Sequence, residues 1–204
     1  MAVESVRQKV SRDLHDDIGS TLSTINILSL MAKSKLREDP SKTIEYLDKI
    51  SDNSSRMMEA MDDIVWSINP VNDNMQKLLA RMRSFATEVL EPKNIDLDLH
   101  FDEALNDIHL DMETRRDLFL LFKEAVNNTA KYSDATHIVI HMRLKNKIMK
   151  LTVQDNGCGF EVEKADSGNG LNNMQKRAEK LKSKYAITSE KGKGTTVILE
   201  MPIT

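Results

Sequence analysis

The chain has 204 residues, of which 40% are hydrophobic and 30% are charged, and its formal net charge is −3. This length and composition accommodate one large domain or two small ones, each with its own core. The slightly negative charge excludes a broad basic surface for nucleic acid, and the single cysteine, Cys158, excludes an internal disulfide framework. No apolar run approaches membrane-spanning length and no signal-peptide pattern is present, so we expect a cytoplasmic protein.

The first 70 residues predict a hairpin of two long amphipathic helices. Apolar residues recur every three or four positions from Val3 onwards, and we expect this helix to end near Arg37, before Pro40. Ser41 is expected to cap a second helix that continues to Ile68. One hairpin cannot bury two continuous apolar stripes by itself. We therefore predict a homodimer in which two hairpins form a four-helix bundle.

A histidine lies at the flank of the first apolar stripe. His15 follows Leu14, about 100° further round the helix, and Gly19 comes one turn later. A glycine inside a helix costs about 1 kcal/mol relative to alanine, and one reason to keep it is room for a bulky group to approach the imidazole. The alternative is a surface histidine beside a tolerated glycine. This segment alone leaves both interpretations open.

After a polar break, the remaining residues predict a second domain in which helices and strands alternate. We expect helices over 75–90, 112–131 and 171–181, and strands over 95–101, 136–144, 147–154, 185–189 and 195–201. Two of these strands form a hairpin that turns at 145–146. The predicted fold is a helical hairpin followed by a two-layer α/β sandwich with a mixed, mostly antiparallel sheet. The predicted domains are residues 1–70 and 75–204, joined by a linker over 71–74.

Glycine is concentrated in one part of the second domain. Six of the seven glycines form three Gly-x-Gly pairs between residues 157 and 194. Three pairs in one short region indicate backbone that must stay close to a ligand, and the pair at 168–170 directly precedes a helix whose free N–H groups suit a phosphate. The spacing matches neither a P-loop nor a Rossmann fingerprint, because no Gly-Lys-Ser/Thr follows and the context is antiparallel.

Taken together, the motifs resemble those of bacterial sensor histidine kinases, especially the nitrate-sensor and membrane-thermosensor subfamily with a His-Asp-x-x-Gly box. Five segments carry this resemblance in the family's order. They are HDDIG at 15–19, EAVNNTAKY at 124–132, DNGCG at 155–159, GNGLNNM at 168–174 and GKGT at 192–195. The resemblance implies a phosphotransfer hairpin followed by a Bergerat-fold domain that binds ATP and Mg²⁺. It also implies a response regulator as partner.

The resemblance assigns roles to one helix face in the second domain. Glu124, Asn128 and Lys131 are spaced i, i+4 and i+7 on that face. Asn128 would offer its amide oxygen to Mg²⁺, Glu124 would hold a metal-bound water, and Lys131 would bring positive charge toward the phosphates. The alternative for this face is a row of solvated charges.

Other residues are implied to contact the nucleotide. Asp155 would accept the adenine amino proton, with support from the hydroxyl of Thr195, and Tyr132 would lie against the adenine. Arg177 either reaches the phosphates or is an ordinary solvated arginine. The remaining residues implied at the nucleotide are Gly157, Gly159, Gly168, Gly170 and Leu171.

The resemblance also implies a chemistry for the histidine. Neutral His15 would attack the γ-phosphorus of ATP with one ring nitrogen while Asp16 holds the proton on the other. Adjacent side chains on a helix do not normally face each other, so the role of Asp16 rests on the resemblance. His15 would then pass the phosphoryl group to an aspartate of the regulator.

Two other functions remain as alternatives. One is an ATP-binding dimeric scaffold without phosphotransfer, and the other is an ATPase clamp of the gyrase and mismatch-repair type. His15 with Gly19 argues against the clamp, and Asn128 with Asp155 argues against the scaffold. Because helical periodicity is already under way at Val3, we expect the cytoplasmic portion of a longer sensor. Any membrane attachment would come through a sensor segment absent from this chain.

Overall fold

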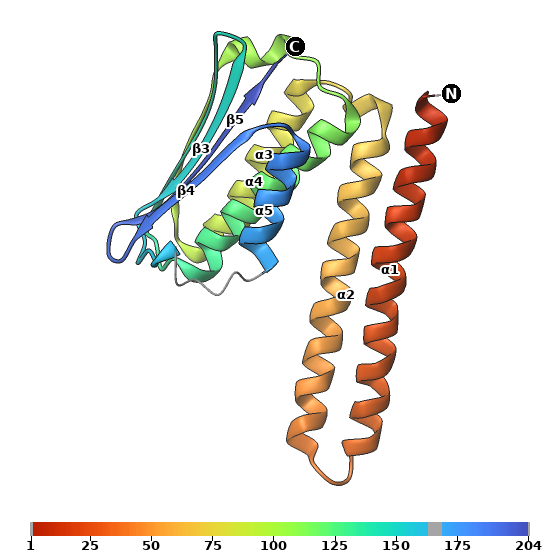
Figure 1. Ribbon diagram of the computed structural model, residues 1–204. Helices are drawn as coiled ribbons and strands as arrows, with labels where there is room; N and C mark the ends of the chain where they lie inside the picture. Colours follow the sequence, from red (N-terminus) through yellow and green to blue (C-terminus); the bar gives the residue numbers. More distant parts are fainter. Residues whose placement is uncertain (1, 163–168, 204) are drawn as a thin grey trace. The chain divides into compact units, whose positions relative to one another are not determined.

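The computed structural model describes residues 2–162 and 169–203, with side chains described for 19–162 and 170–203. The chain forms two compact units, Met1–Asn69 and Pro70–Thr204. The first unit is a hairpin of two long helices, α1 (Ala2–Lys35) and α2 (Pro40–Ile68), drawn in red and orange in Figure 1. The predicted helical N-terminal part is thereby confirmed.

A short turn joins the two helices and fixes where α2 begins. The carboxylate of Asp39 accepts a hydrogen bond from the Lys42 N–H at 3.1 Å, and Pro40 occupies the first helical position. Proline suits that position because its fixed φ is already helical and no N–H is needed there. The buried Thr43 hydroxyl also bonds the Asp39 carbonyl oxygen, at 3.2 Å. The cap is therefore Asp39, and the prediction of Ser41 is wrong.

Most apolar side chains of this hairpin remain exposed. Among the described side chains of residues 19–69, the buried apolar ones are Ala32 and Ile64. By contrast, Leu30, Ile44 and Val65 are 61%, 60% and 61% exposed. The other large exposed apolar side chains are Leu22, Ile27, Met31, Leu36, Leu47, Met58, Met61 and Ile68. Apolar surface of this extent on a hairpin is typical of a protein–protein interface.

The second unit is a two-layer sandwich in which three helices cover one face of a five-stranded sheet (Figure 1). The helices are α3 (Met75–Leu90), α4 (Met112–Tyr132) and α5 (Asn169–Lys180), with short 3₁₀ turns at Pro70–Asn72, Glu91–Lys93 and Glu103–Asp107. The strands are β1 (Asp96–Phe101), β2 (His137–Lys145), β3 (Ile148–Asp155), β4 (Lys184–Glu190) and β5 (Gly194–Pro202).

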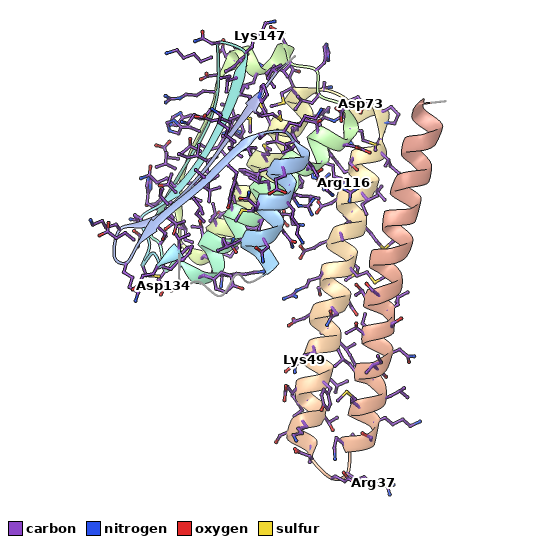
Figure 2. All side chains as sticks on the ribbon, in the orientation of Figure 1. Arg37, Lys49, Asp73, Arg116, Asp134 and Lys147 are labelled. Atoms are coloured by element: carbon purple, nitrogen blue, oxygen red, sulfur yellow. The ribbon has the colours of Figure 1, made fainter. Side chains whose placement is uncertain are left out.

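The sheet has the strand order β1-β2-β3-β5-β4. Strand β1 runs parallel to β2, and the other three pairings are antiparallel. The predicted mixed, mostly antiparallel sheet is thus confirmed. The β2–β3 turn lies at Asn146 and Lys147, one residue later than predicted. Both adopt positive φ, of 51° and 59°, as a two-residue hairpin turn requires, and Lys147 is labelled in Figure 2.

Strand alternation decides which side chains face the helices. On β3, Met149, Leu151, Val153 and Asp155 are buried, while the residues between them are more exposed. The helix layer contributes Phe122 from the middle of α4, which is fully buried. Because side chains alternate along a strand, the last residue of β3 places a carboxylate at the edge of an apolar core.

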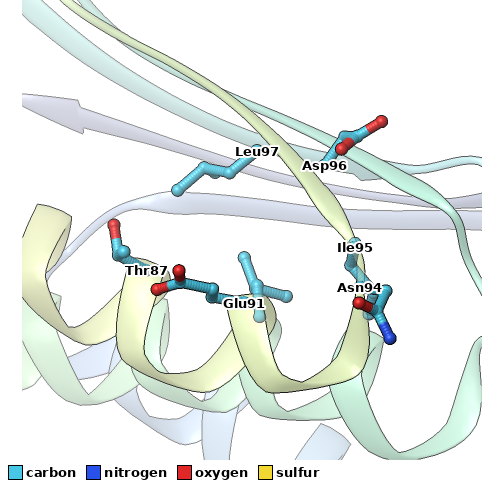
Figure 3. A pocket seen from close by; sticks show the side chains of 7 residues that line it. Thr87, Glu91, Asn94, Ile95, Asp96 and Leu97 are labelled. Atoms are coloured by element: carbon cyan, nitrogen blue, oxygen red, sulfur yellow. The ribbon is translucent and has the colours of Figure 1, made fainter.

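A shallow hollow of about 420 Å³ lies where α3 leads into β1 (Figure 3). It is lined by Thr87, Leu90, Glu91, Asn94, Ile95, Asp96 and Leu97, none of which is a predicted site residue. Across residues 2–162 and 169–203, every helix is too short or too polar to cross a membrane.

Asp39→Ala is expected to destabilise the helical hairpin by about 1 kcal/mol, because it removes the side-chain acceptor at the start of α2. Urea unfolding of this variant, of a control variant and of wild type, at matched protein concentration, measures the change in the free energy of unfolding. Ser41→Ala is the matched control and should shift stability by no more than about 0.5 kcal/mol. Equal losses in both variants would contradict the cap assignment.

Candidate nucleotide-binding site

The site is built around the carboxylate of Asp155, which is only 7% exposed. Its Oδ1 accepts hydrogen bonds from the backbone N–H groups of Gly157 at 2.9 Å and Thr195 at 3.2 Å. Its Oδ2 accepts one from the hydroxyl of Thr129 at 3.3 Å. A buried carboxylate needs such donors to offset its lost hydration. Held in this way, it presents an acceptor suited to the amino group of a nucleobase.

Three glycines allow the surrounding backbone segments to approach one another. A Cβ on Gly157 would meet the carbonyl oxygen of Ser133 at the end of α4, and one on Gly194 would meet the carbonyl oxygen of Asp155. Gly159 has φ +58°, and a Cβ there would meet the carbonyl oxygen of Glu190. The glycine pairs predicted a ligand close to the backbone. At these three positions, another backbone segment of the protein is the close neighbour.

A fourth glycine faces the predicted functional side chains of α4. A Cβ on Gly170, in the first turn of α5, would meet Oε1 of Glu124 and lie 3.8 Å from Nδ2 of Asn128. Both side chains are half-buried. The structure therefore brings together Glu124, Asn128 and Gly170, three of the predicted residues, at the beginning of α5. Their carboxylate and amide oxygens are the donor types that Mg²⁺ prefers.

A tyrosine hydroxyl is buried near this cluster. Among the described residues, the hydroxyl of Tyr185 on β4 has no hydrogen-bond partner. Burial of the phenol and, to a smaller extent, the carboxylate charge of Glu124 together raise the pKa of Tyr185 to about 12. The phenol therefore stays neutral throughout the physiological range. Tyr185 could not be singled out from the sequence, because its place in the alternation of β4 is that of a core residue.

Two atomic details differ from the predictions. The hydroxyl of Thr195 bonds the Ser189 hydroxyl at 2.9 Å, so Thr195 supports Asp155 through its backbone N–H instead. The hydroxyl that contacts Asp155 belongs to Thr129, to which the sequence analysis assigned no role. A signal was present, because a buried polar residue continues the apolar stripe of α4 formed by Phe122 and Ala125.

Arg177 was predicted either to reach the phosphates or to be solvated, and the structure instead pairs it with a carboxylate. Its Nη1 lies 2.7 Å from Oδ1 of Asp117 on α4, and the two side chains are 27% and 14% exposed. It is therefore neither an ordinary solvated arginine nor a free cation directed at phosphates.

The remaining predicted residues are exposed, half-buried or outside the described set. Lys131 and Tyr132 end α4 and are exposed, Tyr132 to 72%, and Leu171 is half-buried. Gly168 lies outside the described residues. His15 and Asp16 belong to α1, and their side chains also lie outside the described set.

Comparison with known families distinguishes a histidine kinase from an ATPase clamp of the gyrase type. Residues 113–204 match the model of the histidine kinase-, DNA gyrase B- and HSP90-like ATPases, and residues 6–73 match a histidine kinase model. The first match alone would also fit a gyrase-like clamp, whereas the second does not. Together the two matches cover most of the chain, which belongs to the bacterial sensor histidine kinase family. Its membership of the ATPase family implies that this histidine kinase core binds ATP.

Curated relatives of this histidine kinase core include a sensor histidine kinase and a sensor protein. The sensor histidine kinase LiaS of Bacillus subtilis is 25% identical over 204 residues, covering 98% of this chain and 55% of LiaS. The sensor protein VraS of Staphylococcus aureus is 26% identical over 203 residues, covering 98% and 56%. The chain thus spans about half the length of the curated relatives it matches.

Solved structures share the fold of this kinase core. The histidine kinase domain of a blue-light activated kinase from Erythrobacter litoralis has a TM-score of 0.60 at 13% identity, covering 96% of this chain and 94% of that one. Full-length ShkA in complex with AMPPNP has a TM-score of 0.61 at 13% identity, covering 97% and 46%. At such low identity, these likenesses show the fold alone.

Thr129→Val is expected to weaken ATP binding about 2- to 10-fold, because the Asp155 carboxylate loses a hydroxyl donor. Thr195→Val, which keeps the backbone donor, should change it less than about twofold. Asp155→Ala, which leaves the adenine amino group unpaired, should cost about 5- to 150-fold. Titration calorimetry gives the three affinities. A larger loss for Thr195→Val than for Thr129→Val would contradict the assignment of the hydroxyls.

Proposed function

We propose that this chain transfers the γ-phosphoryl group of ATP to its own His15 and then to an aspartate of a response regulator. The supporting observation is that one chain combines a histidine-bearing helical hairpin, matched by a histidine kinase model, with the buried Asp155 carboxylate. A gyrase-like clamp would need only the second feature. In this proposal, residues 1–70 serve dimerisation and phosphotransfer, 71–74 are the linker, and 75–204 bind the nucleotide.

The residue that would hold the adenine is supported by the same helix whose side chains would hold the phosphates. Asp155 accepts the adenine amino proton, and its partner Thr129 directly follows Asn128 in α4. Asn128 and Glu124 would hold Mg²⁺, directly and through water, and the ion would neutralise phosphate charge. Within the described residues there is no cage of three or more metal-binding side chains. None is required, since Mg²⁺ in such sites keeps waters and binds the substrate's phosphates.

Further contacts to the nucleotide follow from the motifs. Lys131 would bring positive charge to the phosphates, and Tyr132 would lie against the adenine, where its exposed ring would lose water contact. The backbone of Gly157, Gly159, Gly168, Gly170 and Leu171 would line the nucleotide.

The transfer itself needs a neutral imidazole and a positioned phosphate. One ring nitrogen of His15 forms a bond to the γ-phosphorus, the bond from phosphorus to the bridging oxygen breaks, and ADP leaves. Asp16 accepts a hydrogen bond from the other ring N–H and stabilises the imidazolium that develops. The phosphoryl group then passes from nitrogen to a carboxylate oxygen of the regulator, which regenerates neutral His15.

The kinase would act as a homodimer in the cytoplasm, as part of a longer sensor. Most of the exposed apolar side chains of α1 and α2 would be buried when two hairpins form a four-helix bundle. Met57, Met58 and Met61 of α2 would offer the response regulator an adaptable apolar surface. A sensor segment outside this chain would supply any membrane attachment.

Incubation with Mg²⁺ and γ-labelled ATP should label wild type, with a label that is lost in acid and stable in alkali, as expected for phosphohistidine. His15→Gln should abolish the label while leaving ATP affinity unchanged, because the nucleotide site lies in the other unit. Absence of label on wild type that still binds ATP would favour the scaffold alternative. Label that survives His15→Gln would refute the assignment of the phosphoacceptor.

Residues 1–70 alone should sediment as a dimeric helical bundle, whereas residues 75–204 should be monomeric. The hairpin exposes long apolar stripes, while the second unit encloses its own core. Sedimentation equilibrium over a range of concentrations measures both fragments. A monomeric, helical 1–70 fragment would contradict the proposed bundle.

A further inference from the structure

Helices α4 and α5 pack against each other on one face of the sheet (Figure 1). They meet at two places for which the structure gives contacts. At the first, Gly170 of α5 lies against Glu124 of α4. At the second, Arg177 of α5 lies 2.7 Å from Asp117 of α4. From the first contact to the second, the residue number increases along α5 and decreases along α4. The two helices are therefore antiparallel.

The two contacts are equally spaced on both helices. Asp117 precedes Glu124 by seven residues, and Arg177 follows Gly170 by seven. Seven residues make about two helical turns, or about 10.5 Å. Between the contacts lie Leu121 on α4 and Met174 on α5, both fully buried. Helix α5 thus contacts α4 at the candidate nucleotide site through Gly170, and two turns later through the ion pair of Arg177 with Asp117.

The burial of the pair makes it more than an ordinary surface contact. The side chains of Asp117 and Arg177 are 14% and 27% exposed, so water screens their attraction less than it does for an exposed pair. For comparison, Lys150 and Glu200 on the outer face of the sheet form a pair of 2.9 Å with 45% and 35% exposure. Breaking the first pair leaves a half-buried charge without its partner, which is strongly unfavourable.

We propose that Asp117 and Arg177 are positioning residues, whose ion pair holds α5 against α4 so that Gly170 stays in place beside Glu124 and Asn128. This inference rests on the proposed function, because the proposed function places the phosphates of the nucleotide beside Glu124, Asn128 and Gly170. Loss of the pair would let α5 tilt about its apolar stripe. The adenine end would be unaffected, because Asp155 is held by Gly157, Thr129 and Thr195, none of which belongs to α5.

Hydrogen exchange of the whole chain without nucleotide tests the positioning directly. Arg177→Met and Asp117→Asn should each speed exchange of the amides of α5 about tenfold, while those of α3 keep their wild-type rates. The charge swap Asp117→Arg with Arg177→Asp should restore protection of α5. Lys150→Met, which breaks the outer-face pair, is the matched control and should leave α5 unchanged.

Nucleotide affinity tests whether loss of the ion pair weakens binding of the phosphate end of ATP. Each single variant should weaken ATP binding about five- to tenfold in calorimetry, while adenosine binding, followed by chemical-shift titration, stays at the wild-type value. The swap should recover ATP affinity. A purely structural defect would instead weaken ATP and adenosine alike.

Three results would overturn the proposal. They are wild-type exchange of α5 in both single variants, equal losses for ATP and adenosine, and a swap no better than the single variants. Failure of the proposed function would look different. Wild type would then carry no label on His15, while exchange of α5 would still respond to the pair and to its swap.

Discussion

The buried carboxylate of Asp155 is the constraint on which the nucleotide-binding unit depends. A carboxylate at the edge of an apolar core is stable only where several donors reach it, and here they come from three directions. The backbone of Gly157 follows β3, the backbone of Thr195 begins β5, and the hydroxyl of Thr129 belongs to α4. One side chain therefore ties together two adjacent strands and the helix that covers them.

This arrangement explains why the glycines near Asp155 are needed. Gly157 and Gly194 bring backbone segments so close that a Cβ at either position would collide with a carbonyl oxygen. Those close approaches direct the two backbone N–H groups at the carboxylate. The carboxylate is thus oriented before any ligand arrives, and binding a nucleobase need not first order this part of the site.

The sequence predicted the elements well because periodicity is a strong signal in this chain. The predicted bounds of α3 agree with those of the structure, and alternation along β3 predicted a strand that ends one residue before Asp155, where the structure ends it at Asp155. Local details were harder to predict. Asp39 and Ser41 are both good capping residues, and the choice between them depends on Pro40 occupying the first helical turn.

Long-range partners could not be predicted from the sequence for a different physical reason. The partner of Arg177 is sixty residues away on another helix, and the choice of Asp117 depends on how α5 crosses α4. Likewise, Thr195 contacts Asp155 through its N–H because β5 begins beside the end of β3. Side-chain type indicates which interactions are possible. Only the packing of the elements decides which atoms meet.

The two units differ in what constrains their sequences. In the nucleotide-binding unit, Gly157, Gly159 and Gly194 each lie against a backbone carbonyl oxygen of the same unit, so the fold itself requires a residue without a side chain there. In the hairpin, a Cβ on Gly19 would meet none of the described atoms within 4 Å. The apolar side chains that follow Gly19 on α1 are likewise largely exposed. The constraints on this helix therefore point to contacts made outside the hairpin, as the proposed transfer of a phosphoryl group from ATP to His15 and on to a response regulator would require.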